Sequence, residues 1–234
     1  MARTGPEVHH THRDVSGGWL RPAVFGAMDG LVSNAALVAG VAGGSSARHA
    51  VLLAGLAGLC AGAFSMAAGE YISVASQSEL AQAEIEVERA ELAANPRGER
   101  LELVEVYVAR GVDRELARQV VDQLSRDPEQ ALAVHVREEL GLDADALPSP
   151  LLAAGSSFVS FALGAVLPVL PYLLGAGLAA SVLTTLVALF AGGAVVAQVT
   201  ARPWWFSGSR QLVLGGAALA LTYAVGQAVG GVAG

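Results

Sequence analysis

Carboxylates recur at helical spacing in the middle of the chain. Glu84, Glu88 and Glu91 stand at positions i, i+4 and i+7, which places them on one face of a helix. Like charges at this spacing repel each other, at a cost of a few tenths of a kcal/mol per pair. A bound cation would remove that repulsion. The spacing therefore indicates either a metal-binding face or a solvated acidic face, and the residues alone leave both interpretations open.

More potential metal ligands follow downstream. Glu99 and Glu102 are three residues apart, and His135 precedes Glu139 by one helical turn, with Glu138 beside it. Carboxylates together with one imidazole suit Fe²⁺, Mn²⁺ or Zn²⁺ better than Cu⁺. Protons compete for the same ligands, so metal release and protonation are linked. We therefore expect these residues to bind divalent ions reversibly, without a permanently bound cofactor.

One acid, Asp29, lies inside an otherwise uncharged apolar segment. An ionisable group at membrane depth costs at least ~2.5 kcal/mol and usually faces a bundle interior or an ion pathway. Gly26 and Gly30 flank it and would let another backbone or an ion come close. This pattern favours a role for Asp29 in translocation. The alternative is a structural carboxylate, held by Ser33 and Asn34.

Two residues of the next apolar segment extend this candidate pathway. Met66 carries a thioether, which is usually a packing group but becomes a soft ligand for a borderline metal when it lies opposite an Asp. Glu70 follows one helical turn later, where the apolar run gives way to acids. We therefore predict a pathway that contains Asp29, Met66 and Glu70.

The composition indicates what must position these residues. Only 15% of the 234 residues are charged and 53% are hydrophobic, whereas soluble domains carry about 25% charged residues. Of the 21 acids, 17 lie within residues 77–145, with 8 of the 14 arginines. We therefore predict an all-α membrane protein with one acidic insert. The sequence offers no basic surface suited to nucleic acid.

The apolar runs predict five transmembrane helices, with a cytoplasmic insert of three to four helices between the second and the third. One long helix should leave the membrane and enter the insert, because neither Gly nor Pro interrupts residues 71–95. The predicted parts are a polar cytoplasmic tail at 1–21, helices 1 and 2 at 22–76, a metal-binding domain at 77–147, and helices 3 to 5 at 148–234.

Several local features refine this layout. Pro168 and Pro171 should kink or unwind the third span, and Trp204 and Trp205 should anchor an interfacial loop at residues 202–210. All arginines outside the spans fall on one side of the membrane except Arg48. By the positive-inside rule, this places the N-terminus and the insert in the cytoplasm and the C-terminus outside, in a multi-pass cell-membrane protein.

Two patterns predict a homodimer. The insert has only about ten apolar residues for a core, which is thin for an independent domain. Glycines four residues apart, at 58 and 62 and again at 226 and 230, are typical of closely packed membrane helices. Both features favour a second copy of the chain as a partner, in addition to the lipid bilayer.

The motifs in combination resemble those of the vacuolar iron transporter family, and in particular its bacterial members. The similarity covers residues from about 13 to 233. The strings that carry it are DGLVSNAALVAGVAGG, AGAFSMAAGEYISVASQSE, YVARGVDRELARQV, REELGL and FALGAVLPVLPYLL. The resemblance implies a homodimer that moves Fe²⁺, and often Mn²⁺, out of the cytosol in exchange for protons.

The resemblance also implies roles for single residues. Asp29 matches the first-helix Asp of the translocation path, and Met66 matches the second-helix Met. The carboxylates of the family's cytoplasmic metal-binding domain are matched by Glu88, Glu91, Glu99, Glu102 and Glu139.

The chain departs from the plant-type pattern at two places. Gly58 stands where the plant pathway has a Glu, two turns before the Met, and this puts proton coupling in doubt; Glu70 could substitute for it. His135 and Val136 stand where the plant insert has a Met pair. Imidazole in place of thioether favours harder or borderline ions.

Two other function classes remain open at this stage. One is a membrane-bound di-iron ferroxidase or iron-storage protein, although no Glu-x-x-His motif of the ferritin-like kind occurs in the insert. The other is a non-transporting membrane protein with an acidic partner-binding domain, which would leave Asp29 without a role. A transporter, and not an enzyme, accounts best for the residues.

Overall fold

The computed structural model describes residues 18–144, 146–200 and 202–233. It consists of two compact units. The first unit contains the described residues up to Ala67 and those from Gly155 onward, and the second spans Ala68–Ala154. Most of the predicted polar tail lies outside the described residues.

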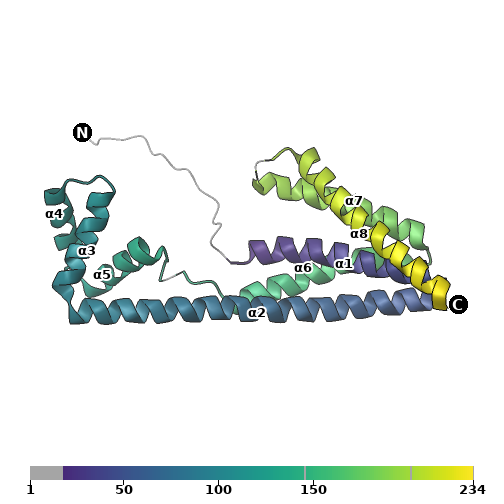
Figure 1. Ribbon diagram of the computed structural model, residues 1–234, viewed down its shortest axis with the longest axis horizontal. Coiled ribbons are helices and arrows are strands. Elements are labelled where there is room, and N and C mark those ends of the chain that lie inside the picture. Colours follow the sequence, from purple (N-terminus) through teal and green to yellow (C-terminus); the bar gives the residue numbers. More distant parts are fainter. Residues whose placement is uncertain (1–17, 145, 201, 234) are drawn as a thin grey trace, which may run out of the picture. The chain divides into compact units, whose positions relative to one another are not determined.

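Five helices of the described chain are long and apolar enough to cross a membrane. This confirms the prediction of an all-α membrane protein with five spans. The second of them continues through 47 residues without a break, as predicted. The five are α1 (Leu20–Gly44), α2 (Arg48–Ala94), α6 (Pro150–Leu173), α7 (Leu178–Thr200) and α8 (Trp204–Ala233) (Figure 1).

Most of the loop predicted before the last span is helical, so that prediction is wrong. The α8 helix begins at Trp204, directly after Pro203. The Pro203 carbonyl accepts hydrogen bonds from the backbone N–H groups of Phe206, at 3.1 Å, and Ser207, at 3.2 Å. The Trp204 ring meets Phe190 of α7 edge to face, with the ring centroids 5.9 Å apart. The two tryptophans are therefore the first residues of α8.

The α6 helix passes through both of its prolines and is not interrupted at either. Side chains of neighbouring segments donate hydrogen bonds to its backbone in this region. Ser181 Oγ donates to the Pro168 carbonyl at 2.6 Å, and the Arg48 guanidinium donates to the Tyr172 carbonyl at the C-terminal end. These bonds do not replace the ones that the prolines remove, because the carbonyls that lose a donor are those of Gly164 and Leu167. The helix ends before Gly175, whose φ is +95°.

Glycines bring α1 and α6 into backbone contact beside Asp29. A Cβ atom at Gly26 would lie 2.8 Å from the Ser157 carbonyl oxygen, and one at Gly30 would collide with the Phe161 carbonyl. In the opposite direction, a Cβ at Gly164 would collide with the backbone of α1. Only small residues allow this separation. The crossing therefore fixes the part of α1 that carries the acid.

The glycine pair of α8 packs within the same chain. Gly226 lies against the backbone of Gly40, and Gly230 lies against Gly44, so that α1 and α8 are in close contact. The α7 helix lies beside α8 in the same unit (Figure 1). Gly58 and Gly62 likewise lie against Leu37 and Phe161 of the same chain, so neither glycine pair requires a second chain. This removes one of the two arguments for a homodimer.

The second unit contains the acidic end of α2 and a set of short helices. The three short α-helices each start with a side-chain cap: Asn95 accepts from the Gly98 N–H at 3.1 Å, Asp113 from Glu115 at 2.9 Å, and Asp127 from Glu129 at 3.0 Å. The helices are α3 (Pro96–Ala109), α4 (Arg114–Leu124), α5 (Pro128–His135) and a π-helical turn, η1 (Val136–Leu140).

Two small apolar clusters hold this unit together. Leu103 and Val104 of α3 pack on Ala117 and Val121 of α4, and these two helices lie side by side in Figure 1. The second cluster consists of Ile85 of α2, Leu132 of α5 and Val136 of η1. This second cluster joins the acid-bearing helix to the segment that carries the histidine.

Candidate functional sites

Three potential metal ligands converge in the second unit. Glu88 comes from α2, His135 is the last residue of α5, and Glu139 lies on η1. His135 Nδ1 is 2.9 Å from Glu139 Oε1 and 3.1 Å from Glu88 Oε1. The side chains of His135 and Glu88 are only 1% and 6% exposed, and that of Glu139 is 22% exposed. We call these three residues the Glu–His–Glu triad.

Apolar neighbours position each member of the triad. Glu88 follows buried Ile85 by three residues and precedes partly buried Leu92 by four, so it shares their helix face. His135 stands next to Val136, which is fully buried in the same cluster. The packing of Ile85 on Val136 therefore brings the carboxylate of one helix to the imidazole of another.

The triad places two carboxyl groups around one imidazole. Burial raises the pKa of Glu88 above its ordinary value of 4.5, the Glu139 carboxylate raises it further, and His135 lowers it. Glu88 Oε1 is within ion-pair distance of Nδ1, but it accepts no hydrogen bond of good geometry. Nδ1 also lies 2.9 Å from Glu139 Oε1, so the two carboxyl groups compete for one imidazole nitrogen.

The geometry of the triad suits a metal ion bound through Nδ1. The candidate ligand atoms all lie within 4.8 Å of one another. Ligands about 2.1 Å from a metal and about 90° apart are separated by about 3 Å. The observed separations of 2.9 and 3.1 Å agree with this. Two carboxylates with one imidazole are a donor set for Fe²⁺, Mn²⁺ or Zn²⁺.

Further carboxylates surround the triad. Burial raises the pKa of Glu99, as does the charge of Glu102, with smaller contributions in the same direction from Glu91 and Glu139. Glu99 is itself only 8% exposed, whereas Glu91 and Glu102 are exposed. Predicted ligands from α2, α3 and η1 thus interact electrostatically as one group.

Two of the predicted ligands lie outside this group. Glu138 forms an ion pair with Arg110 at the end of α3, which occupies its carboxylate. Glu84 is exposed and has no ion pair or hydrogen bond with any residue that the structure describes. Helical spacing placed Glu84 with Glu88, but only Glu88 has a neighbouring helix opposite it.

The first unit contains a cavity between α1, α2 and α6, with a volume of about 300 Å³. Asp29 of α1 and Met66 of α2 both line it, as the predicted pathway requires. Glu70 lies one helical turn beyond Met66, belongs to the second unit, and is not among the lining residues. The cavity is lined by Asp29, Ser33, Asn34, Leu37, Gly58, Gly62, Ser65, Met66 and Phe161.

Neither Ser33 nor Asn34 holds the Asp29 carboxylate, although the interpretation of Asp29 as a structural acid requires this. Ser33 Oγ donates to the backbone carbonyl of Asp29, at 2.6 Å, and not to its side chain. Asn34 Nδ2 donates to the Ala165 carbonyl, also at 2.6 Å. No described residue forms a hydrogen bond or an ion pair with the carboxylate. The acid is therefore available to an ion or a proton in the cavity.

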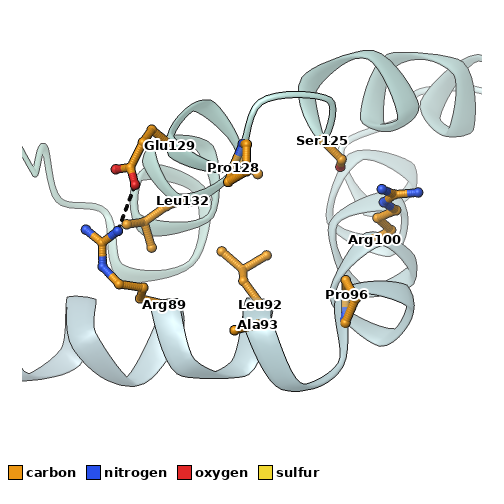
Figure 2. Close-up of a pocket in the computed structure, with 10 residues that line it drawn as sticks. Arg89, Leu92, Ala93, Pro96, Arg100, Ser125, Pro128, Glu129 and Leu132 are labelled. Carbon is orange, nitrogen blue, oxygen red and sulfur yellow. Dashed lines mark hydrogen bonds and ion pairs between the residues drawn. The ribbon is translucent and has the colours of Figure 1, made fainter.

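A second cavity, of about 440 Å³, lies within the acidic unit. Figure 2 shows Arg89 reaching across to Glu129, at 2.9 Å, while Leu92 and Leu132 point into the space between the helices. Arg100 lies at its other end (Figure 2). With two guanidinium groups and one carboxylate on its walls, this cavity does not suit a metal cation.

Comparisons with known proteins all lead to the same family. The family model described as "VIT family" matches residues 20–227. A "Vacuolar iron transporter" from Acanthamoeba castellanii is 40% identical over 216 residues, covering 89% of this chain and 78% of the relative. "Vacuolar iron transporter 1" from Oryza sativa subsp. japonica is 34% identical, covering 94% and 90%. The Arabidopsis thaliana protein of that name is 35% identical, covering 79% and 76%.

Proposed function

The chain belongs to the VIT family, and on this premise we propose that it transports Fe²⁺, Mn²⁺ or both across a membrane. The observation that carries this proposal is the cavity between apolar helices that Asp29 and Met66 both line. A carboxylate and a thioether together offer one hard and one soft donor, which suits a borderline divalent ion. The names of the relatives support iron as a transported ion.

Proton antiport is the mechanism that best explains Asp29. A carboxylate at membrane depth is stable when it holds either a proton or a cation. Metal binding to a carboxylate displaces its proton, so the two ligands exclude each other. Asp29 is the one acid among the residues lining the cavity. We therefore propose that it alternates between a proton and the transported ion, exchanging about one proton per ion at this site.

The Glu–His–Glu triad and its neighbours act as a collecting site in this proposal. Residues 77–145 have a net charge of 8 − 17 = −9, and such a negative potential raises the local concentration of divalent cations. With the insert and the N-terminus in the cytoplasm, as the arginines indicate, transport would run out of the cytosol. The insert would bind several ions reversibly.

One observation still supports a homodimer, which is therefore part of the proposal. Leu101 and Leu116 are each 53% exposed and Val120 is 38% exposed, although all three lie in the unit whose own core is small. A partner would cover such residues. Mass measurement in a lipid-like environment tests this, and a monomer at working concentration would contradict it.

Ion flux in proteoliposomes tests the proposed function directly. Purified protein is reconstituted with a pH gradient, and uptake of Fe²⁺ and Mn²⁺ is recorded together with internal pH. We expect metal movement coupled to proton movement in the opposite direction. Metal binding without flux would instead favour a storage or ferroxidase role, and neither binding nor flux would favour a partner-binding protein.

A further inference from the structure

Asn34, five residues after Asp29 on α1, holds its amide in a fixed orientation. Its side chain is buried, with 2% exposed, and Nδ2 donates to the Ala165 carbonyl of α6 at 2.6 Å. A carbonyl can only accept, so the NH₂ end must face α6 and the oxygen must face the other way. That oxygen, Oδ1, has no hydrogen-bond partner among the described residues. A buried polar atom without a partner requires an explanation.

The unpartnered oxygen lies against Gly58 of α2, which has no side chain. A Cβ atom at Gly58 would lie 2.7 Å from Asn34 Oδ1 and 2.5 Å from Leu37 Cδ2. Asn34 and Gly58 both line the cavity that holds Asp29 and Met66. Oδ1 can lie this close to α2 because position 58 is glycine, and any larger residue there would collide with it.

We propose that Asn34 Oδ1 is a third ligand of the transported ion, beside the Asp29 carboxylate and the Met66 thioether. This inference rests on the proposed function, because it takes the cavity to be the ion pathway. Amide oxygens bind hard and borderline divalent cations. Unlike a carboxylate, the amide does not compete for the ion with a proton. Asn34 would thus contribute affinity while Asp29 alone contributes the proton exchange.

The hydrogen bond to Ala165 has a structural role of its own, which the test must separate from ligation. Ser181 supplies a matched control. Its hydroxyl donates to another α6 carbonyl, that of Pro168, also at 2.6 Å, and it is equally buried at 2%. Ser181 does not line the cavity. Ser181→Ala therefore removes a comparable bond to α6 and leaves the proposed ligands in place.

The experiment measures Mn²⁺ binding to the full-length protein in lipid nanodiscs, from the loss of the free Mn²⁺ signal in electron paramagnetic resonance. The triad is first weakened by Glu88→Gln, His135→Gln and Glu139→Gln. The remaining binding that Asp29→Asn removes then defines the membrane site. In this background, Asn34→Leu should weaken that site at least tenfold. Ser181→Ala, which leaves the Asn34 amide in place, should retain the affinity within about threefold.

The other possible results would contradict the role of Asn34, each for a different reason. Unchanged affinity in Asn34→Leu would overturn the role of Asn34 and leave the pathway standing. An equal loss in Ser181→Ala would overturn it too, because the effect would then come from α6. If Asp29→Asn removes no binding, the pathway and the Asn34 ligand both fail. Should Asn34→Leu not fold, Asn34→Ala takes its place with the same expectations.

Discussion

At the scale of single residues, the structure separates acids that helical spacing groups together. Glu84 and Glu88 are one turn apart on α2, yet only Glu88 is buried against His135. Spacing along one helix shows which residues share a face, but not which part of that face meets another element. The distinction between these two glutamates can be tested directly.

We predict that Glu88→Gln weakens metal binding by the acidic unit roughly tenfold or more, because it removes a ligand charge while keeping the shape. Calorimetric titration of the full-length protein with Mn²⁺ measures the effect. Glu84→Gln is the matched control and should leave the affinity unchanged. Equal losses in the two variants would mean that the exposed acidic face binds the ions, and not the triad.

Burial of Glu88 and Glu99 predicts a specific pH dependence of stability in the absence of metal. The pKa of both groups is raised in the folded state, so the folded protein binds more protons than the unfolded chain above pH 4.5. Their contribution to stability is therefore fully present below pH 4.5 and is lost as pH rises through the folded pKa values.

Thermal unfolding in EDTA measures this dependence. The midpoint of the acidic unit should fall as pH rises above 4.5, and Glu88→Gln with Glu99→Gln should flatten the slope. Saturating Mn²⁺ should raise the midpoint most at neutral pH, where both carboxylates are ionised. A metal-free midpoint that rises over this pH range would contradict the assignment of these two groups.

At the scale of helices, glycine sets how closely α1, α6 and α8 approach one another. The crossing of α1 and α6 is the closest to the candidate pathway, since Gly26 and Gly30 stand on either side of Asp29 along the chain. A wider crossing would change the cavity as well as the packing.

Gly164→Ala tests this crossing. The added Cβ would collide with the Ala27 carbonyl of α1, and overpacking of this kind typically costs about 1–3 kcal/mol. Gly155→Ala on the same helix is the control, because a Cβ there meets nothing within 4 Å. In detergent, Gly164→Ala should lower the unfolding midpoint and Gly155→Ala should not. Similar midpoints for the two would show that the close crossing is absent in the membrane.

The helices themselves were largely predictable from the sequence, because apolar runs, caps and prolines act locally. All five spans and the continuous α2 were expected. The error before α8 arose because Pro203 can precede a helix start as well as lie in a loop, and only the bonds to Phe206 and Ser207 decide between them. The prolines of α6 do not unwind it, although each removes one backbone donor from the helix.

The candidate sites were less predictable, because they depend on contacts between distant residues. The resemblance marked Asp29, Met66 and several glutamates of the insert. It did not indicate that Glu88 and Glu139 share one imidazole nitrogen, which follows from the packing of Ile85 on Val136. Nor could the sequence show which way the Asn34 amide points, since that depends on the Ala165 carbonyl of α6.

At the scale of the whole molecule, each of the two compact units has its own proposed function. In the proposed mechanism, the acidic unit would concentrate and bind ions through the triad, and the apolar unit would carry them past Asp29 and Met66. Each unit has its own ligands and its own cavity, so a variant in one should leave metal binding by the other intact. Transport, in contrast, requires the carboxylate in the membrane.

Flux through Asp29→Asn in proteoliposomes with a pH gradient is therefore the most direct test of the central claim. The substitution keeps the size of the side chain but removes the charge that exchanges a proton for a metal ion. The account predicts that Fe²⁺ and Mn²⁺ flux is abolished, while calorimetry still shows metal binding by the Glu–His–Glu triad at the parent affinity. Flux of both ions at the parent rate would contradict it.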